Sequence, residues 1–177
     1  MKKILVVIDM QYDFIEGMLG SENCRAVIPN VVNVINSNKY DEIYLTRDTH
    51  NHEYLNTQEG KKLPIPHCIE YSDGWKIIDE VITAVEDKPH KIIDKNTFGS
   101  LYLANLLRET YFIEQEDIEI DICGIDTEIC VISNAMIIKA AMPESKLCVI
   151  EKACAGTNKK FHDNAISAMQ MCQIDII

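Results

Sequence analysis

Short apolar runs alternate with longer amphipathic stretches along the chain. Residues 3–9 (KILVVID) are almost continuously apolar, which is typical of a strand buried on both faces of a parallel sheet. Similar short runs predict strands at 41–46, 91–94, 118–123, 146–151 and 174–177. Apolar residues at helical spacing predict helices at 26–37, 75–85, 100–110, 130–141 and 159–172. This alternation predicts an α/β fold: a three-layer α/β/α sandwich around a six-stranded, mainly parallel, Rossmann-like sheet.

One long segment, residues 47–71, is polar and has no clear periodicity. A loop of this length inside a compact domain is usually functional. No linker rich in Ser, Gly or Pro divides the sequence, so residues 1–177 are expected to form a single domain. In parallel α/β sheets, ligands bind beyond the carboxyl ends of the strands, so residues that follow predicted strands are the candidates for chemistry.

Composition and charge narrow the class of partner. The chain of 177 residues is 47% hydrophobic and 25% charged, as in ordinary globular proteins, and its net charge is −11. Because this charge repels a phosphate backbone, nucleic acid is not an expected partner. The apolar run from Ile4 to Ile8 is too short to cross a membrane, and Asp9 interrupts it too early for a signal peptide. We therefore expect no membrane partner.

The cysteines indicate a reducing compartment. There are seven, an odd number without C-x-x-C spacing, which predicts reduced thiols in a cytoplasmic protein. Cys24, Cys123, Cys148 and Cys172 stand among apolar residues and are expected to be small buried side chains. Cys130 differs because it begins a predicted helix shortly after a predicted strand.

Three reactive residues follow predicted strands. Asp9 ends the first strand, Lys95 follows the third, and Cys130 begins the helix after the fourth. A nucleophilic cysteine must be a thiolate, which a helix N-terminus and a nearby base or cation favour. Asp9 can accept the thiol proton, Lys95 can hold the resulting ion pair, and backbone N–H groups can stabilise an oxyanion. Together these groups predict acyl transfer from an amide.

Three segments carry a family resemblance. Residues 9–14 (DMQYDF) resemble the D-x-Q-x-D-F opening of the isochorismatase-like cysteine hydrolases, the superfamily that contains nicotinamidases. Lys95, followed by FGS at 98–100, is similar to that family's catalytic lysine segment. Residues 124–131 (GIDTEICV) are similar to its G-x-x-T-x-x-C-V nucleophile turn. The segments stand in the expected order, and the resemblance extends over residues 3–177.

The resemblance implies roles for individual residues. Asp9, Lys95 and Cys130 would form the catalytic triad, and the backbone amides of Asp126 and Cys130 would form the oxyanion hole. A non-proline cis peptide bond would join Ile125 to Asp126. The aspartate itself departs from the family, because a small apolar residue usually stands at that position.

The polar segment contains a candidate metal site. Asp48-x-His50 resembles the Asp-x-His metal pair of nicotinamidases, and His67, after Pro66, resembles their other histidine. These ligands suit a divalent ion, with Zn²⁺ expected first and Fe, Mn or Mg as alternatives. In nicotinamidases this metal holds the pyridine nitrogen of the substrate, and Phe14 would line the same pocket for a flat ring. The alternative is that Asp48 caps a turn and both histidines are surface residues.

The expected function is that of a cysteine amidohydrolase, which converts a small amide of the nicotinamide type to the acid and ammonia through a thioester. The alternatives are an isochorismatase-like hydrolase of another small substrate and a non-catalytic ligand- or metal-binding member of the fold. Hydrolysis of isochorismate itself is disfavoured, because relatives with that activity lack the nucleophilic cysteine. The partner would be a small-molecule amide, and the resemblance implies a homo-oligomer, either a dimer or a tetramer. His52, His90 and His162 are expected to be loop or solvated residues.

Overall fold

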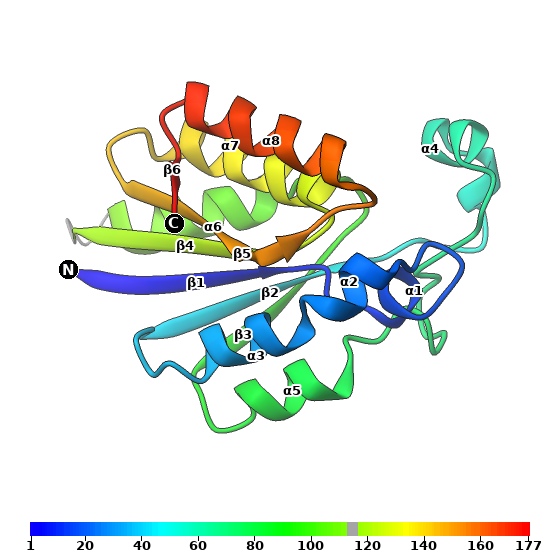
Figure 1. The fold of residues 1–177 in the computed structure, drawn as a ribbon, viewed down its shortest axis with the longest axis horizontal. Coiled ribbons are helices and arrows are strands. Elements are labelled where there is room, and N and C mark those ends of the chain that lie inside the picture. The colour runs from blue at the N-terminus through cyan, green and yellow to red at the C-terminus, as the bar shows by residue number, and fades with distance from the viewer. Residues whose placement is uncertain (113–116) are drawn as a thin grey trace.

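A six-stranded parallel sheet forms the middle layer of the computed structural model, which describes residues 1–112 and 117–177 (Figure 1). The strand order is β3-β2-β1-β4-β5-β6, and every pair of neighbouring strands is parallel. The strands are β1 (Lys2–Ile8), β2 (Glu42–Asp48), β3 (His90–Lys95), β4 (Ile118–Ile125), β5 (Lys146–Ala155) and β6 (Asp175–Ile176). The predicted α/β fold and its six strands are confirmed, with small shifts at the strand ends.

Helices cover both faces of this sheet. The helices of the described residues are α1 (Tyr12–Ile15), α2 (Glu22–Ala26), α3 (Ile28–Ile35), α4 (Gln58–Lys62), α5 (Asp79–Val85), α6 (Leu101–Phe112), α7 (Ile132–Ala141) and α8 (Lys159–Met171). Helices α3 and α5 pack together on one face, while α6, α7 and α8 cover the other (Figure 1). The residues from Ile4 to Ile8 are therefore at most 1% exposed. Burial from two sides explains why β1 is continuously apolar.

The winding of the sheet reverses at β1, and this reversal positions the site. From β1 the chain first adds β2 and β3 on one side and later β4, β5 and β6 on the other. The carboxyl end of β1 therefore lies at the switch point where open α/β sheets bind ligands. Asp9 follows β1 with a left-handed φ of 45°, and Lys95 ends β3 opposite Asp48 of β2.

One short helix was not predicted. The helix expected at 26–37 is α3, Ile28–Ile35, and a separate helix, α2, precedes it and ends at Ala26. The hydroxyl of Ser21 caps α2 by accepting the backbone N–H of Cys24 at 3.1 Å. Pro29 then stands in the first turn of α3, where its missing N–H is tolerated.

Two other helices do not begin where they were predicted. Helix α5 begins at Asp79 and not at residue 75, because Ile77 forms a β-bridge with Gln11. The helix expected from Cys130 begins with a π-helical turn, Thr127–Val131, and continues as α7. A π-helical turn inside a helix is often found at a functional site.

The polar segment predicted as a loop contains its own short elements. A 3₁₀ turn at Tyr54–Asn56 leads into α4, which projects from the layers in Figure 1. Tyr54 is 1% exposed, and its hydroxyl donates to the carbonyl of Leu63 at 3.0 Å. The segment is therefore anchored by its own side chains, as in compact functional loops.

Within the described residues, no helix combines the length and apolar character that crossing a bilayer requires. All seven cysteines are free, and Cys24, Cys123 and Cys148 are buried as expected. The expectation for Cys172 was wrong: its thiol is exposed, because the residue lies at the C-terminal cap of α8, beyond the apolar face of that helix.

Candidate active site

Three strand ends bring Asp9, Lys95 and Cys130 into contact. The Nζ atom of Lys95 lies 2.6 Å from Oδ2 of Asp9 and 3.7 Å from Sγ of Cys130. The three residues are 0%, 6% and 6% exposed, respectively. A carboxylate, an ammonium and a thiol therefore meet in a site almost without solvent, where their electrostatic interactions are strong.

Asp9 is fixed by a neighbour that sequence reasoning missed. The hydroxyl of Thr46 donates to Oδ1 of Asp9 at 2.6 Å and accepts the backbone N–H of Asp9 at 3.2 Å. Burial raises the pKa of the Asp9 carboxyl, while the charge of Lys95 acts in the opposite direction. A buried carboxylate with increased proton affinity, oriented by a hydroxyl, is well suited to accept a proton.

Lys95 and Cys130 respond differently to burial. Burial alone would lower the pKa of Lys95, but the neighbouring Asp9, Cys130 and Asp48 outweigh it, so the net shift is upward and the ammonium persists. Burial raises the pKa of the Cys130 thiol, and the nearby Asp9 carboxylate raises it further. The resting side chain is therefore a thiol, and its activation requires a base in contact with it.

The turn that carries Cys130 has an unusual backbone. The peptide bond between Ile125 and Asp126 is cis, as the family resemblance predicted. Gly124 has a φ of 119°, and a Cβ atom there would overlap the carbonyl oxygen of Ile8. The carbonyl of Asp126 then accepts the N–H of Val131 at 3.0 Å, which closes the π-helical turn.

Asn134 connects this turn to the lysine segment, and the sequence analysis did not identify it. Its side chain donates to the carbonyl of Cys130 at 2.8 Å and to that of Phe98 at 3.1 Å, and it accepts the N–H of Ser100 at 2.9 Å. Asn134 is 0% exposed. The available signal was a lone amide in an apolar helix, four residues after the cysteine.

A second contact supports the turn from α8. Thr127 is fully buried, and its hydroxyl lies 2.9 Å from Nδ1 of His162. His162 was expected to be solvated, but it is only partly exposed and faces the nucleophile turn. His52 and His90 are exposed.

The predicted metal residues also come together. Oδ2 of Asp48 lies 2.9 Å from Nε2 of His50 and 3.5 Å from Nε2 of His67. All three residues are buried, and Nδ1 of His67 is oriented by the carbonyl of Ile65 at 2.9 Å. The alternative of two surface histidines is wrong, because these residues are 7% and 4% exposed.

Glu59 of α4 adds a fourth donor that no motif indicated. Its Oε1 lies 3.7 Å from Nε2 of His50 and 3.6 Å from Nε2 of His67. Ligands of a tetrahedral zinc ion lie about 3.3 Å apart when their bonds are about 2.0–2.1 Å long. The separations between these donors are close to that value, and Nε2 of His50 is buried without a hydrogen-bond partner among the described residues. Two carboxylates and two imidazoles therefore fit a divalent ion.

The charges of this cluster shift its pKa values. Burial would raise the pKa of Asp48, but its pairing with the His50 and His67 rings and the charge of Lys95 outweigh burial and hold the pKa well below its usual range. Burial would lower the pKa of His67, and the hydrogen bond with Asp48 reverses this and raises it.

The D-x-Q-x-D-F segment holds the cluster in place. The side chain of Gln11 accepts the N–H of Asp48 at 2.7 Å and donates to its carbonyl at 2.8 Å. Oδ2 of Asp13 accepts the N–H of Cys68 at 2.6 Å. The Phe14 ring, 8% exposed, lies 5.5 Å from the His67 ring between their centroids.

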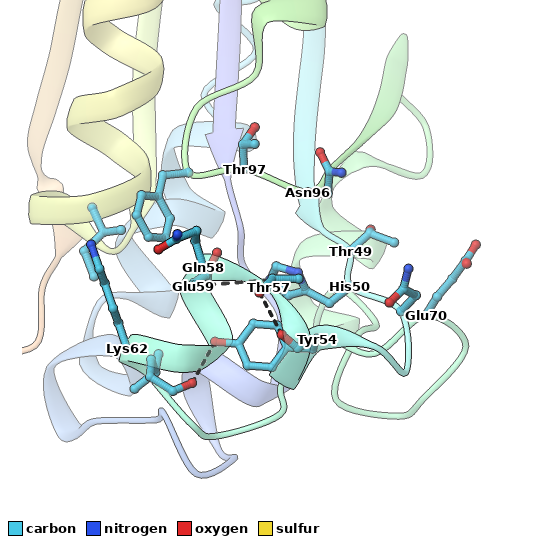
Figure 2. Close-up of a pocket in the computed structure, with 14 residues that line it drawn as sticks. Thr49, His50, Tyr54, Thr57, Gln58, Glu59, Lys62, Glu70, Asn96 and Thr97 are labelled. Carbon is cyan, nitrogen blue, oxygen red and sulfur yellow. Dashed lines mark hydrogen bonds and ion pairs between the residues drawn. The ribbon is translucent and has the colours of Figure 1, made fainter.

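A cavity of about 710 Å³ opens beside the candidate metal-binding cluster. Figure 2 shows its polar side chains, with Glu59 pointing toward His50 and with Asn96 and Thr97 contributed by the segment after Lys95. Its complete lining is Thr49, His50, Asn51, Tyr54, Thr57, Gln58, Glu59, Lys62, Leu63, Glu70, Asn96, Thr97, Phe98 and Ile129. Phe14 is not part of this lining. A cavity of this size can enclose most of a drug-sized molecule.

Comparison with solved structures identifies fold neighbours at low identity. The nicotinamidase/pyrazinamidase from Bacillus subtilis is 23% identical, with a TM-score of 0.84, over 99% of this chain and 99% of that chain. The pyrazinamidase/nicotinamidase from Streptococcus mutans is 24% identical, with a TM-score of 0.83, over 99% and 100%. The pyrazinamidase of Pyrococcus horikoshii, solved in complex with zinc, is 23% identical, with a TM-score of 0.79, over 100% and 99%. These similarities establish the fold.

Sequence comparison establishes the family. No curated protein matches the chain. A family model described as the isochorismatase domain matches residues 3–177. The match confirms the resemblance seen in residues 9–14, 95–100 and 124–131. Because it covers nearly all of the sequence, the chain belongs to the isochorismatase family of hydrolases.

Proposed function

We propose that the protein is a cysteine amidohydrolase that converts a small amide of the nicotinamide type to the acid and ammonia. The observation that carries this proposal is the contact of Lys95 with Asp9 at 2.6 Å and with the Cys130 sulfur at 3.7 Å. A base, a cation and a thiol in contact are the groups that acyl transfer through a thioester requires.

In the acylation half, Asp9 accepts the thiol proton of Cys130, and the thiolate attacks the carbonyl carbon of the amide. The backbone amides of Asp126 and Cys130 donate to the oxygen that becomes negative. Asp9 then transfers its proton to the amide nitrogen, the C–N bond breaks, and ammonia leaves a thioester on Cys130. Lys95 keeps its charge and stabilises both the carboxylate and the thiolate.

In the deacylation half, Asp9 accepts a proton from water, and the resulting hydroxide attacks the thioester carbon. The C–S bond breaks, the acid is released, and the Cys130 sulfur regains a proton from Asp9. The two halves sum to amide plus water giving acid plus ammonia.

We further propose that Asp48, His50, His67 and Glu59 bind a divalent ion, with Zn²⁺ expected first and Fe, Mn or Mg as alternatives. When bound, the ion supplies a Lewis-acid contact for a ring nitrogen of the substrate. The support is the spacing of the four donors and the zinc in the Pyrococcus horikoshii pyrazinamidase structure. Gln11 keeps the aspartate in position through both of its backbone hydrogen bonds.

Two alternatives remain for the test to decide: hydrolysis of another small substrate, and ligand or metal binding without catalysis. The cavity has room for amides larger than a single ring. The Thermoplasma acidophilum neighbour, an N-carbamoylsarcosine amidase, is 19% identical with a TM-score of 0.71 and acts on a non-aromatic amide by its name. Cytoplasmic location, assembly as a dimer or tetramer and a single domain over residues 1–177 stay predictions.

The test is ammonia release from a panel of amides by the zinc-, manganese- and iron-loaded protein. The panel includes nicotinamide, pyrazinamide and N-carbamoyl amino acids, and Cys130→Ala is the matched control. We expect release from at least one amide and a loss of about 10³-fold or more in the variant. Activity that survives in Cys130→Ala, or no release from any amide, would overturn the proposal. In the second case, a slow reaction of Cys130 with iodoacetamide would favour the binding alternative.

A further inference from the structure

Asp126 is a buried acid that the proposed reaction does not use. It is 9% exposed and precedes the π-helical turn, and its main-chain carbonyl accepts the N–H groups of Ile129 at 3.1 Å and Val131 at 3.0 Å. Its backbone is therefore part of the support of Cys130. A carboxyl side chain at this position requires an explanation, because any negative charge there lies beside the place where the proposed reaction develops an oxyanion.

The surroundings of this carboxyl contain a thiol and other acids. The Sγ atom of Cys24, in α2, donates to Oδ1 of Asp126 at 3.3 Å, and Cys24 is 1% exposed. The charged groups that face Asp126 are Glu128, on the same turn, and Asp9, at the end of β1. No Lys, Arg or His in residues 1–112 and 117–177 forms an ion pair with it. A buried carboxyl without a cation tends to keep its proton.

The titration behaviour of the pair agrees with this geometry. Burial raises the pKa of Asp126 to about 7, and Glu128 and Asp9 act in the same direction. Burial and the neighbouring Asp126 raise the pKa of Cys24 to about 12. Near neutral pH, the thiol therefore remains the donor, and the carboxyl is the member of the pair that changes charge.

We propose that Asp126 is a positioning residue that works as a neutral acid. Its carboxyl accepts a hydrogen bond from the Cys24 thiol of α2, and this contact anchors the turn of Cys130 without placing a negative charge beside the oxyanion hole. Loss of the proton introduces that charge and opposes transition-state formation. The oxyanion hole itself belongs to the proposed function, so this inference rests on it. Site-directed variants separate the anchor from the charge.

The anchor is tested at pH 6, where the carboxyl is mostly neutral. Asp126→Asn retains an oxygen that can accept from Cys24, whereas Asp126→Ala does not. Cys24→Ser retains a donor, whereas Cys24→Ala removes it. We expect kcat to fall about tenfold further in each alanine variant than in its conservative counterpart, with KM changed less. Equal losses within each pair would overturn the anchoring role.

The charge is tested by the pH dependence of kcat/KM from pH 6 to pH 9. We expect the ratio of Asp126→Asn to the unmodified enzyme to rise about tenfold over this range, because only the enzyme with aspartate acquires the charge. A ratio that stays constant would overturn the inference while leaving the amidohydrolase proposal intact. Asp9 and Cys130 are present in both proteins, so the ratio reports the effect of the charge at position 126, including its effect on the proton affinity of Asp9.

The protonation of Asp126 can also be measured without turnover. The ¹³C chemical shift of the Asp126 carboxyl, followed by NMR in the unmodified protein, reports its protonation directly. A midpoint near 7 supports the neutral acid, and a midpoint below 5 overturns it. This result does not depend on the variants folding or on any amide being hydrolysed, so it distinguishes failure of the inference from failure of the proposed function.

Discussion

Replacing Asn134 by alanine should weaken both the fold and the alignment of the active site. The amide group of Asn134 makes three hydrogen bonds to the backbone, to the carbonyls of Cys130 and Phe98 and to the N–H of Ser100. The side chain is fully buried, so no water takes its place without rearrangement. Each buried backbone group left without a partner costs about 1–3 kcal/mol, and we expect a total loss of about 3–5 kcal/mol in the free energy of unfolding.

The same change should lower kcat, since Asn134 joins the turn of Cys130 to the segment that follows Lys95. The Lys95 ammonium and the cysteine sulfur are 3.7 Å apart, and a displacement of about 1 Å between reacting groups can cost about 10²-fold in rate. Urea unfolding measures the first effect, and ammonia release below the unfolding transition measures the second.

The matched control is Asn164→Ala, an identical substitution at an exposed position of α8, where we expect a change within about 0.5 kcal/mol. If Asn134→Ala loses less than about 1 kcal/mol and retains full kcat, the three hydrogen bonds do not connect the two segments energetically. The reasoning from buried polar groups would then be refuted for this site.

Three further outcomes are expected. Glu59→Gln should weaken zinc binding about 10–100-fold in a chelator competition, and an unchanged affinity would remove this residue from the ligand set. His162→Ala should lower kcat about tenfold with little change in KM, and His162→Gln should restore part of it; equal losses in the two variants would exclude the contact with Thr127 as the cause. Asp126→Asn should change the pH dependence of stability. In the unmodified protein the fold raises the pKa of Asp126 from 3.8 to about 7, so this residue lowers the free energy of unfolding as pH rises from 4 to 7, by at most about 4 kcal/mol. Urea unfolding at pH 4, 6 and 8 should show the variant gaining on the unmodified protein over that interval, and parallel curves would contradict a buried neutral acid.

The sequence predicted that Asp9, Lys95 and Cys130 lie close together, because their proximity depends on the topology of the sheet. An apolar run such as residues 3–9 has few structural solutions, and strands that alternate with helices form a parallel sheet whose carboxyl ends share one edge. Asp9, Lys95 and Cys130 stand directly at such ends or at the following helix, so their proximity follows from chain order. The same topology brings Asp48 and His50 to this edge of the sheet, because β2 lies beside β1.

Residues on irregular segments escaped prediction for a related reason. Glu59 reaches the two histidines only because it lies in a one-turn helix that follows a 3₁₀ turn, and neither element has a periodic signature. His162 lies 35 residues from Thr127, and only the packing of α8 against the turn brings them together. The short helix α2 also escaped prediction, because it begins at a cap, the hydrogen bond from the Cys24 N–H to Ser21, and five residues are too few for a periodic pattern.

Lys95 interacts with two buried carboxylates at once. Its ammonium is 2.6 Å from Asp9 and 3.3 Å from Asp48, so one buried cation balances a carboxylate of the proposed triad and a carboxylate of the proposed metal ligands. Removing it leaves two buried acids without that cation, which destabilises the fold and changes both proton affinities at once. A loss of activity in Lys95→Ala therefore combines a less stable fold, altered proton affinities of the two acids and the loss of the positive charge. Lys95→Arg keeps the charge and alters the geometry. Comparison of these two variants, at a pH where both are folded, separates the need for a positive charge from the need for a small ammonium in contact with sulfur.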